Sequence, residues 1–169
     1  LGVAGKIIEQ GLICPIWQQR DARDNWSVEW DLGILKEDTN HPYRIQCEQF
    51  KLTRVIVAEL AKMKNVEILF SVKAVSADQD EQGVTLKVDT ADGLKELKGR
   101  YLIASDGASS VIRASQEIKF PGLTFPELWL CVSTEFEFEN YFDNLAPVAY
   151  FSAENFWFLL LRVPGLWRG

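Results

Sequence analysis

Several features common in nucleotide-binding, membrane and nucleic-acid-binding proteins are missing from this sequence of 169 residues. No two glycines are separated by a single residue and no Gly-Asp dipeptide occurs, so a G-x-G-x-x-G dinucleotide fingerprint is absent. The longest apolar run, Phe156 to Leu161, is far shorter than the ~18 residues that a membrane span needs, so no membrane span is predicted. Acidic residues outnumber basic ones, 24 to 18, which argues against nucleic acid as a partner.

Residues that bind metals or form disulfides are also scarce. His41 is the only histidine, and the three cysteines are widely spaced with no C-x-x-C pair. This composition predicts no metal site and no disulfide framework, and it favours reduced thiols in a cytoplasmic protein. A Ser-His-Asp triad would need His41, but no G-x-S-x-G elbow is present to position a nucleophile.

Hydrophobic periodicity predicts a mixed α and β protein. Helical spacing is found at residues 2–10 and, most strongly, at 45–63, while 18–25 is a polar stretch. Alternation or apolar runs predict strands around 26–30 and at 66–70, 72–77, 84–89, 94–98, 101–104, 128–138, 148–151 and 156–163. The Asp92-Gly93 turn predicts a hairpin, and Ser109 or Ser110 is expected to cap a short helix that runs to about residue 116.

The stretch from 99 to 113 carries the clearest chemical signal. An apolar run ends at Asp106, Gly107 allows close approach of the backbone, Ser110 opens a helix and Arg113 follows one turn later. A carboxylate at a strand end suits sugar hydroxyls, and a guanidinium near a helix start suits phosphate. The alternative is that Asp106 only forms a turn and that Arg113 is a surface charge.

The pattern D-G-x-x-S-x-x-R at residues 106–113 resembles the second cofactor motif of FAD-dependent aromatic hydroxylases of the para-hydroxybenzoate hydroxylase class. Further segments resemble this family in the same order along the chain: Arg44 to Leu52, Phe120 to Phe125, and Leu160 to Arg168. The resemblance covers about three quarters of the chain. It implies a mixed α/β fold with part of an FAD-binding domain and an antiparallel substrate-binding sheet.

The resemblance also implies roles for individual residues. Asp106, Gly107 and Ser110 would belong to the FAD site, and Arg113 would contact pyrophosphate or the nicotinamide cofactor. Gln49 would be the helix-start glutamine that approaches FAD, with Gln46 as runner-up; the alternative for Gln49 is an ordinary exposed amide. Arg44 is either a phosphate ligand or a loop charge.

The last third of the chain is rich in aromatic residues, with 13 of the 20 between Phe120 and Trp167. The resemblance makes this region the sheet that covers the isoalloxazine ring of FAD. Because strand side chains alternate between two faces, each aromatic residue belongs either to the core or to the pocket wall. The candidates for the substrate pocket are Trp129, Phe136, Phe138, Tyr150, Phe156 and Phe158, and no catalytic residue or metal ligand is named.

The chain also departs from the family, because both outer parts of the FAD site are missing. We therefore expect the central part of a longer enzyme, in which residues 1–25 and 44–118 belong to an incomplete FAD-binding domain. Residues 26–43 and 119–169 would belong to an incomplete substrate domain. The isolated chain is expected to bind FAD weakly or not at all and to be inactive.

The resemblance implies a monooxygenase that hydroxylates a phenolic or related aromatic compound with NADH or NADPH and O2, through a flavin C4a-hydroperoxide. Two alternatives stay open: a non-enzymatic domain that binds small molecules, and an FAD oxidoreductase that does not insert oxygen. The sequence does not specify the substrate, the preferred nicotinamide cofactor or the oligomeric state.

Overall fold

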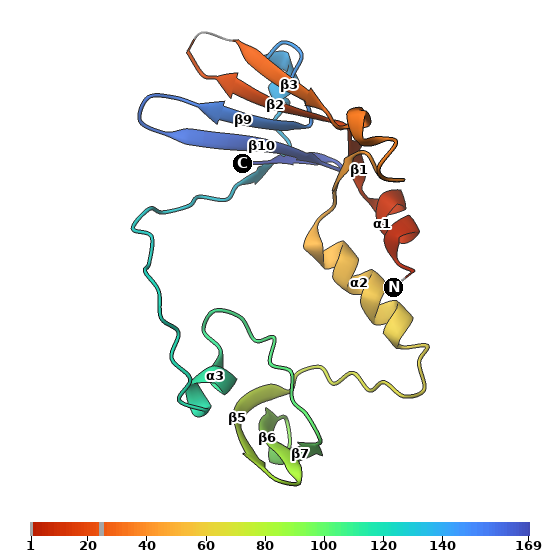
Figure 1. Ribbon diagram of the computed structural model, residues 1–169, viewed down its shortest axis with the longest axis vertical. Helices are drawn as coiled ribbons and strands as arrows, with labels where there is room; N and C mark the ends of the chain where they lie inside the picture. Colours follow the sequence, from red (N-terminus) through yellow and green to blue (C-terminus); the bar gives the residue numbers. More distant parts are fainter. Residues whose placement is uncertain (1, 24–25) are drawn as a thin grey trace. The chain divides into compact units, whose positions relative to one another are not determined.

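The computed structural model describes residues 2–23 and 26–169, and the chain forms two compact units. The first comprises residues 1–66 and 128–169, and the second comprises residues 67–127 (Figure 1). Each unit combines β-sheet with helix, which supports the predicted mixed α/β class. The bounds of the two units differ from those of the two domains expected for the whole enzyme, and that division remains a prediction.

The first unit is built on a six-stranded sheet with the strand order β3-β2-β9-β10-β11-β8. All neighbours are antiparallel except β2 and β9, which are parallel. The central hairpin of β9 and β10 matches the strands predicted there. The strands are β2 (Ile16–Asp21), β3 (Ser27–Asp31), β8 (Ser133–Thr134), β9 (Val148–Ser152), β10 (Trp157–Val163) and β11 (Leu166–Arg168).

One face of this sheet carries the hydrophobic core. The cluster consists of buried side chains from β9, β10 and β11, against which the segment around the short helix η2 (Phe138–Asn140) packs. Phe151 and Phe158 stack with their ring centroids 4.5 Å apart. The buried members of the core cluster are Ala149, Phe151, Leu160 and Trp167, and the partly buried members are Phe138, Phe142, Leu145 and Phe158.

Most of strand β2 falls in the stretch at residues 18–25 that was interpreted only as polar. Its residues alternate between the two faces, and Gln18 and Arg20 are buried, at 1% and 3% exposure. Two nitrogens of the Arg20 guanidinium donate to the Asp143 carbonyl at 3.1 Å. Alternation of apolar and polar residues therefore did not identify this strand, because polar side chains that bind backbone groups can occupy the inward-facing positions of a strand.

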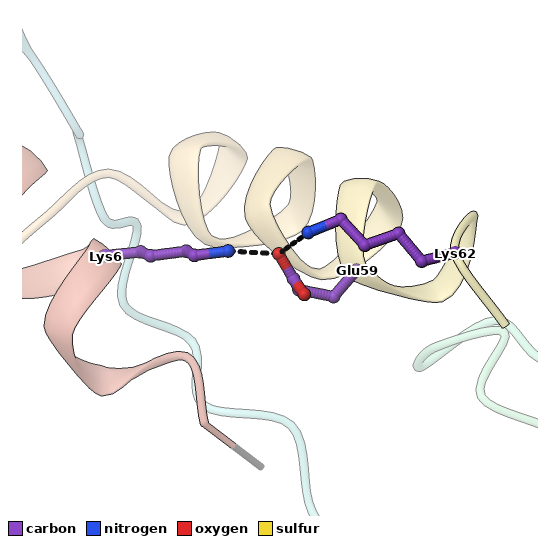
Figure 2. A network of polar contacts seen from close by, with 3 residues as sticks. All are labelled: Lys6, Glu59 and Lys62. Carbon is purple, nitrogen blue, oxygen red and sulfur yellow. Dashed lines mark hydrogen bonds and ion pairs between the residues drawn. The ribbon is translucent and has the colours of Figure 1, made fainter.

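The two longer helices were predicted, and both lie in the first unit. Helix α1 (Ala4–Gln10) leads into β1 (Leu12–Cys14), and β4 (Arg44–Gln46), which pairs with β1, precedes helix α2 (Gln49–Leu60). A short helix, η1 (Leu32–Leu35), follows β3. Glu59 of α2 accepts hydrogen bonds from Lys6 of α1 and from Lys62, and this contact links the two helices (Figure 2).

The second unit is a three-stranded antiparallel meander with a short helix. Strands β5 (Lys73–Asp80), β6 (Gly83–Thr90) and β7 (Gly93–Gly99) pair in sequence order. The predicted Asp92-Gly93 hairpin is confirmed, with Gly93 at φ +98°. Helix α3 (Val111–Ser115) packs on β5, and the Ser115 hydroxyl accepts the Ala77 N–H at 3.3 Å.

Three predicted strands are wrong or shortened. Residues 66–70 and 101–104 are not strands, and within 128–138 only β8 forms. Tyr101 and Ile103 are 83% and 89% exposed. An apolar run forms a strand only where a neighbour completes its hydrogen bonds, and no described strand pairs with these residues. No helix in the described part of the chain has the length and apolar character needed to cross a membrane.

Candidate functional site

The junction between β4 and α2 presents a polar side chain with an unusual environment. Gln46, the last residue of β4, is 7% exposed, and its amide nitrogen Nε2 has no hydrogen-bond partner among the described residues. Pairing of Gln46 with Leu12 of β1 fixes the backbone there. A buried amide without a partner costs about 1–3 kcal/mol, so this group requires an explanation.

Helix α2 begins at this junction without a side-chain cap. Glu48 is the N-cap residue, but its carboxylate forms an ion pair with Lys51 Nζ at 2.7 Å instead of accepting from the helix. Burial is the largest single influence on the pKa of Glu48 and acts to raise it. Hydrogen bonds from Lys51 and from the Glu48 backbone, together with the positive charges of Lys51 and Arg168, act the other way, so the pKa lies below its usual value. Gln49 at the first helical position and Arg44 at the start of β4 are both exposed.

The 106–113 turn lies in the second unit and has the local structure that its sequence indicates. Gly107 adopts φ +82°, a left-handed conformation that favours glycine. The Ser110 hydroxyl caps α3 by accepting the Arg113 N–H at 2.9 Å, and Asp106 Oδ2 accepts the Ile112 N–H at 3.2 Å. Hydrogen bonding from Ser110 and then from Ile112 lowers the pKa of Asp106, so this exposed carboxylate is ionised at neutral pH.

Arg113 is engaged within its own segment. Its Nη2 donates to the Ala108 carbonyl at 2.6 Å, and its guanidinium lies over the Phe120 ring, 4.2 Å from the centroid. The hydrogen bond to Ala108 uses one of the five N–H donors of the guanidinium, and a role for Arg113 at pyrophosphate or at the nicotinamide cofactor stays a prediction.

The outer face of the six-stranded sheet, opposite the core, is aromatic. Trp17 of β2 lies 4.9 Å from Trp30 of β3 and 5.5 Å from Tyr150 of β9, measured between ring centroids. Trp129 contacts Trp157 of β10 edge to face at 4.8 Å. An open cavity of about 290 Å³ on this sheet is lined by Gln19, Tyr150, Phe151, Ser152 and Trp157.

The six predicted pocket residues are divided between the two faces. Tyr150 lines the cavity, and Trp129 contacts its wall through Trp157. Phe138 and Phe158 pack against the core, Phe156 stacks near Phe158, and Phe136 contacts Phe138. Their roles at a substrate stay predictions.

Four of the residues that line this cavity were not among the predicted pocket residues: Gln19, Phe151, Ser152 and Trp157. The alternation of Trp17, Gln19 and Asp21 was the available signal for β2, but this part of the chain was interpreted only as polar.

A second cavity, of about 550 Å³, lies in the unit formed by residues 67–127. It is bordered by the β5–β6 turn, residues 100–102 and α3, and its wall includes Arg100 and several acidic side chains. Across the described ranges, no group of three or more His, Cys, Asp or Glu side chains is arranged to hold a metal ion. His41 instead contacts the Tyr43 hydroxyl, with 3.1 Å between Nδ1 and Oη.

Comparison with known proteins places these observations in a family. The family described as "FAD binding domain" matches residues 1–156, so the chain belongs to this family. Para-nitrophenol 4-monooxygenase of Pseudomonas sp. (strain WBC-3) is 27% identical over 169 residues, which cover 99% of this chain and 41% of that protein. A 6-hydroxy-3-succinoylpyridine 3-monooxygenase of Pseudomonas putida is 28% identical, over 83% of this chain and 36% of that protein.

Solved structures agree with this assignment. The p-nitrophenol 4-monooxygenase from Pseudomonas putida DLL-E4 superimposes with a TM-score of 0.92 at 27% identity, covering 99% of this chain and 42% of that one. Aklavinone-11 hydroxylase, solved with FAD and aklavinone, shares the fold with a TM-score of 0.70 at 18% identity, over 99% of this chain and 34% of that one. The chain thus spans about two fifths of the length of the first of these relatives.

Proposed function

We propose that the whole protein is an FAD-dependent monooxygenase that hydroxylates a small aromatic compound with NADH or NADPH as reductant. Membership of the FAD-binding family and the aromatic monooxygenases among its relatives support this proposal. The structural observation that carries it is the buried amide nitrogen of Gln46 beside the start of α2, which has no hydrogen-bond partner in residues 2–23 and 26–169.

The residues at this junction fit FAD. The cofactor is rich in hydrogen-bond acceptors, namely ribityl hydroxyls, phosphate oxygens and flavin carbonyls, and the free Nε2 of Gln46 is a donor. An acceptor there would remove the cost of about 1–3 kcal/mol of leaving that amide unpaired. Gln46 is therefore our first choice for the cofactor contact, ahead of the exposed Gln49, and Arg44 is an exposed cation within the same strand as Gln46.

The turn at residues 106–113 is the other segment of the chain that we propose for FAD binding. Apart from its two chain neighbours, no described residue has a heavy atom within 4 Å of the position that a Cβ of Gly107 would occupy, so this backbone is open to a ligand. The ionised Asp106 would accept hydrogen bonds from sugar hydroxyls. When bound, FAD supplies the redox chemistry, accepting a hydride from the nicotinamide and reducing O2, while the chain binds and orients the reactants.

The cofactor contact is tested in the whole protein by replacing Gln46 with leucine and measuring the Kd of FAD after reconstitution of the apoprotein. Loss of one buried hydrogen bond predicts a Kd about tenfold higher. The matched control is Gln49→Leu, three residues away, which should leave Kd within about a factor of two to three. If Gln49→Leu weakened FAD binding more than Gln46→Leu, Gln49 and not Gln46 would be the residue that contacts the cofactor.

The reaction is tested by supplying NADH or NADPH, O2 and a panel of phenols, with isotopically labelled O2 and mass analysis of the products. A ring hydroxyl that contains one labelled oxygen is expected. Reductant consumption that yields only hydrogen peroxide with every phenol would favour an FAD oxidoreductase without oxygen insertion. If the whole protein neither bound FAD nor turned over any substrate, a non-enzymatic binding domain would be favoured.

A further inference from the structure

The cavity on the outer face of the six-stranded sheet indicates which kind of aromatic compound the protein accepts. This inference rests on the proposed function. We infer that the cavity between Gln19, Ser152 and Trp157 binds an uncharged, single-ring aromatic compound through a neutral polar substituent.

The size and the walls of the cavity fit a small planar ring. Its volume of about 290 Å³ is at the lower end of the range of roughly 300–1,000 Å³ typical of pockets for small molecules. Tyr150 and Trp157 supply aromatic side chains on neighbouring strands, and register places Trp157 directly opposite Ser152. Flat aromatic walls favour a planar ligand that can stack or meet them edge to face.

The polar groups of the cavity are neutral. The Gln19 amide nitrogen donates to the Ser152 hydroxyl oxygen at 2.8 Å, which leaves the hydroxyl hydrogen of Ser152 free to donate to a ligand. The carboxamide oxygen of Gln19 is an acceptor for a ring hydroxyl. Such a pair matches a hydroxyl or nitro group on the ring.

The charges near this pair disfavour an anionic substituent. None of the lining side chains is cationic. Asp21 follows Gln19 by two residues on β2, and register pairs it with Ser152, so a carboxylate lies on the same side of the strand. Arg23, just beyond β2, is paired with Glu154 at 3.3 Å. A ligand carboxylate would lose its hydration here and gain no cation in return.

The test compares two ligands of nearly the same shape and different charge. We would measure the Kd of 4-nitrophenol and of 4-hydroxybenzoate for the FAD-loaded whole protein by quenching of tryptophan fluorescence, below the pKa of the nitrophenol hydroxyl. The nitro and carboxylate groups are both planar, but only the carboxylate is charged. We expect 4-nitrophenol to bind at least about tenfold more tightly, as one unpaired charge contact would predict. Equal or tighter binding of 4-hydroxybenzoate would overturn the inference.

Substitutions at the cavity test whether the preference for the uncharged ligand arises there. Gln19→Arg should reverse the preference by supplying a cation, whereas Val28→Arg should not. Val28 is the cross-strand partner of Gln19 on the same face, but it does not line the cavity. The same reversal in both variants would show that the preference reflects general charge rather than this cavity. Ser152→Ala, which changes one exposed hydroxyl, should weaken 4-nitrophenol binding severalfold even if Gln19→Arg fails to fold, and unchanged binding would contradict the inference.

Failure of this inference can be distinguished from failure of the proposed function. A protein that prefers 4-hydroxybenzoate and inserts oxygen into it retains the monooxygenase function and refutes the neutral cavity. A protein that binds 4-nitrophenol with the predicted dependence on Gln19, but inserts no oxygen into any phenol, retains the cavity and refutes the reaction.

Discussion

Replacement of Gln18 by leucine should destabilise the protein far more than an exchange of one polar side chain for an apolar one normally does. The Gln18 side chain connects β2 to a segment more than 120 residues later in the chain. Its Nε2 donates to the Asn144 carbonyl at 2.7 Å and to the Glu29 carboxylate, and its Oε1 accepts the Ala146 N–H at 2.8 Å. At 1% exposure, water cannot replace these partners.

The magnitude follows from the groups that the substitution would leave behind. The Ala146 N–H and the Asn144 carbonyl would each lose a partner, at about 1–3 kcal/mol each. Burial of the leucine side chain offsets about 1–2 kcal/mol of this. The expected net loss in the free energy of unfolding is therefore about 2–3 kcal/mol, in the middle of the range that these contributions span.

Urea unfolding followed by tryptophan fluorescence measures this loss. The matched control is Gln19→Leu, the next residue of the same strand on the opposite face, which makes one exposed hydrogen bond to Ser152. Its effect should lie within about 0.5–1 kcal/mol. If the two variants unfold at the same urea concentration with the same slope, Gln18 does not hold the sheet to the 143–146 segment as argued.

Three further predictions concern other parts of the chain. Hydrogen bonds from Lys6 and Lys62, together with their charges, lower the pKa of Glu59 from 4.5 to about 2. The ionised Glu59 therefore stabilises the folded protein fully at a pH above 4.5, and this contribution is lost as the pH falls toward about 2. The difference in unfolding free energy between the natural protein and Glu59→Gln should accordingly vanish in acid and shrink in high salt. Gly107→Ala should cost about 1–2 kcal/mol because of its left-handed φ, whereas Gly5→Ala within α1 should be neutral or stabilising; equal effects on the melting temperature would contradict this. Burial raises the pKa of the Cys14 thiol, so a thiol reagent should modify the exposed Cys131 rapidly and Cys14 only on unfolding, as peptide mass mapping would reveal.

Local patterns in the sequence predicted much of the secondary structure. The apolar stripe of α2, the Asp92-Gly93 turn and the capping Ser110 are encoded within a few residues, and all three appear as expected. The apolar run at residues 101–104 was not informative on its own, because a strand depends on a partner that the run itself does not specify.

The candidate site was only partly predictable. The order of the family motifs pointed to residues 44–49 and 106–113, but not to which glutamine is buried without a partner. That distinction depends on the pairing of β4 with β1. The same limit applies to the aromatic residues, which composition alone could not assign to the core or to the cavity wall.

The sequence by itself determined the family, through short motifs in a fixed order, and the helices and turns, through interactions between near neighbours. Only the tertiary structure decided that Gln18 and Arg20 point into the core while Gln19 faces a cavity. The physical reason is that a polar side chain can be buried once distant backbone groups satisfy its hydrogen bonds, and the backbone partners of Gln18 and Arg20 lie more than 120 residues away along the chain.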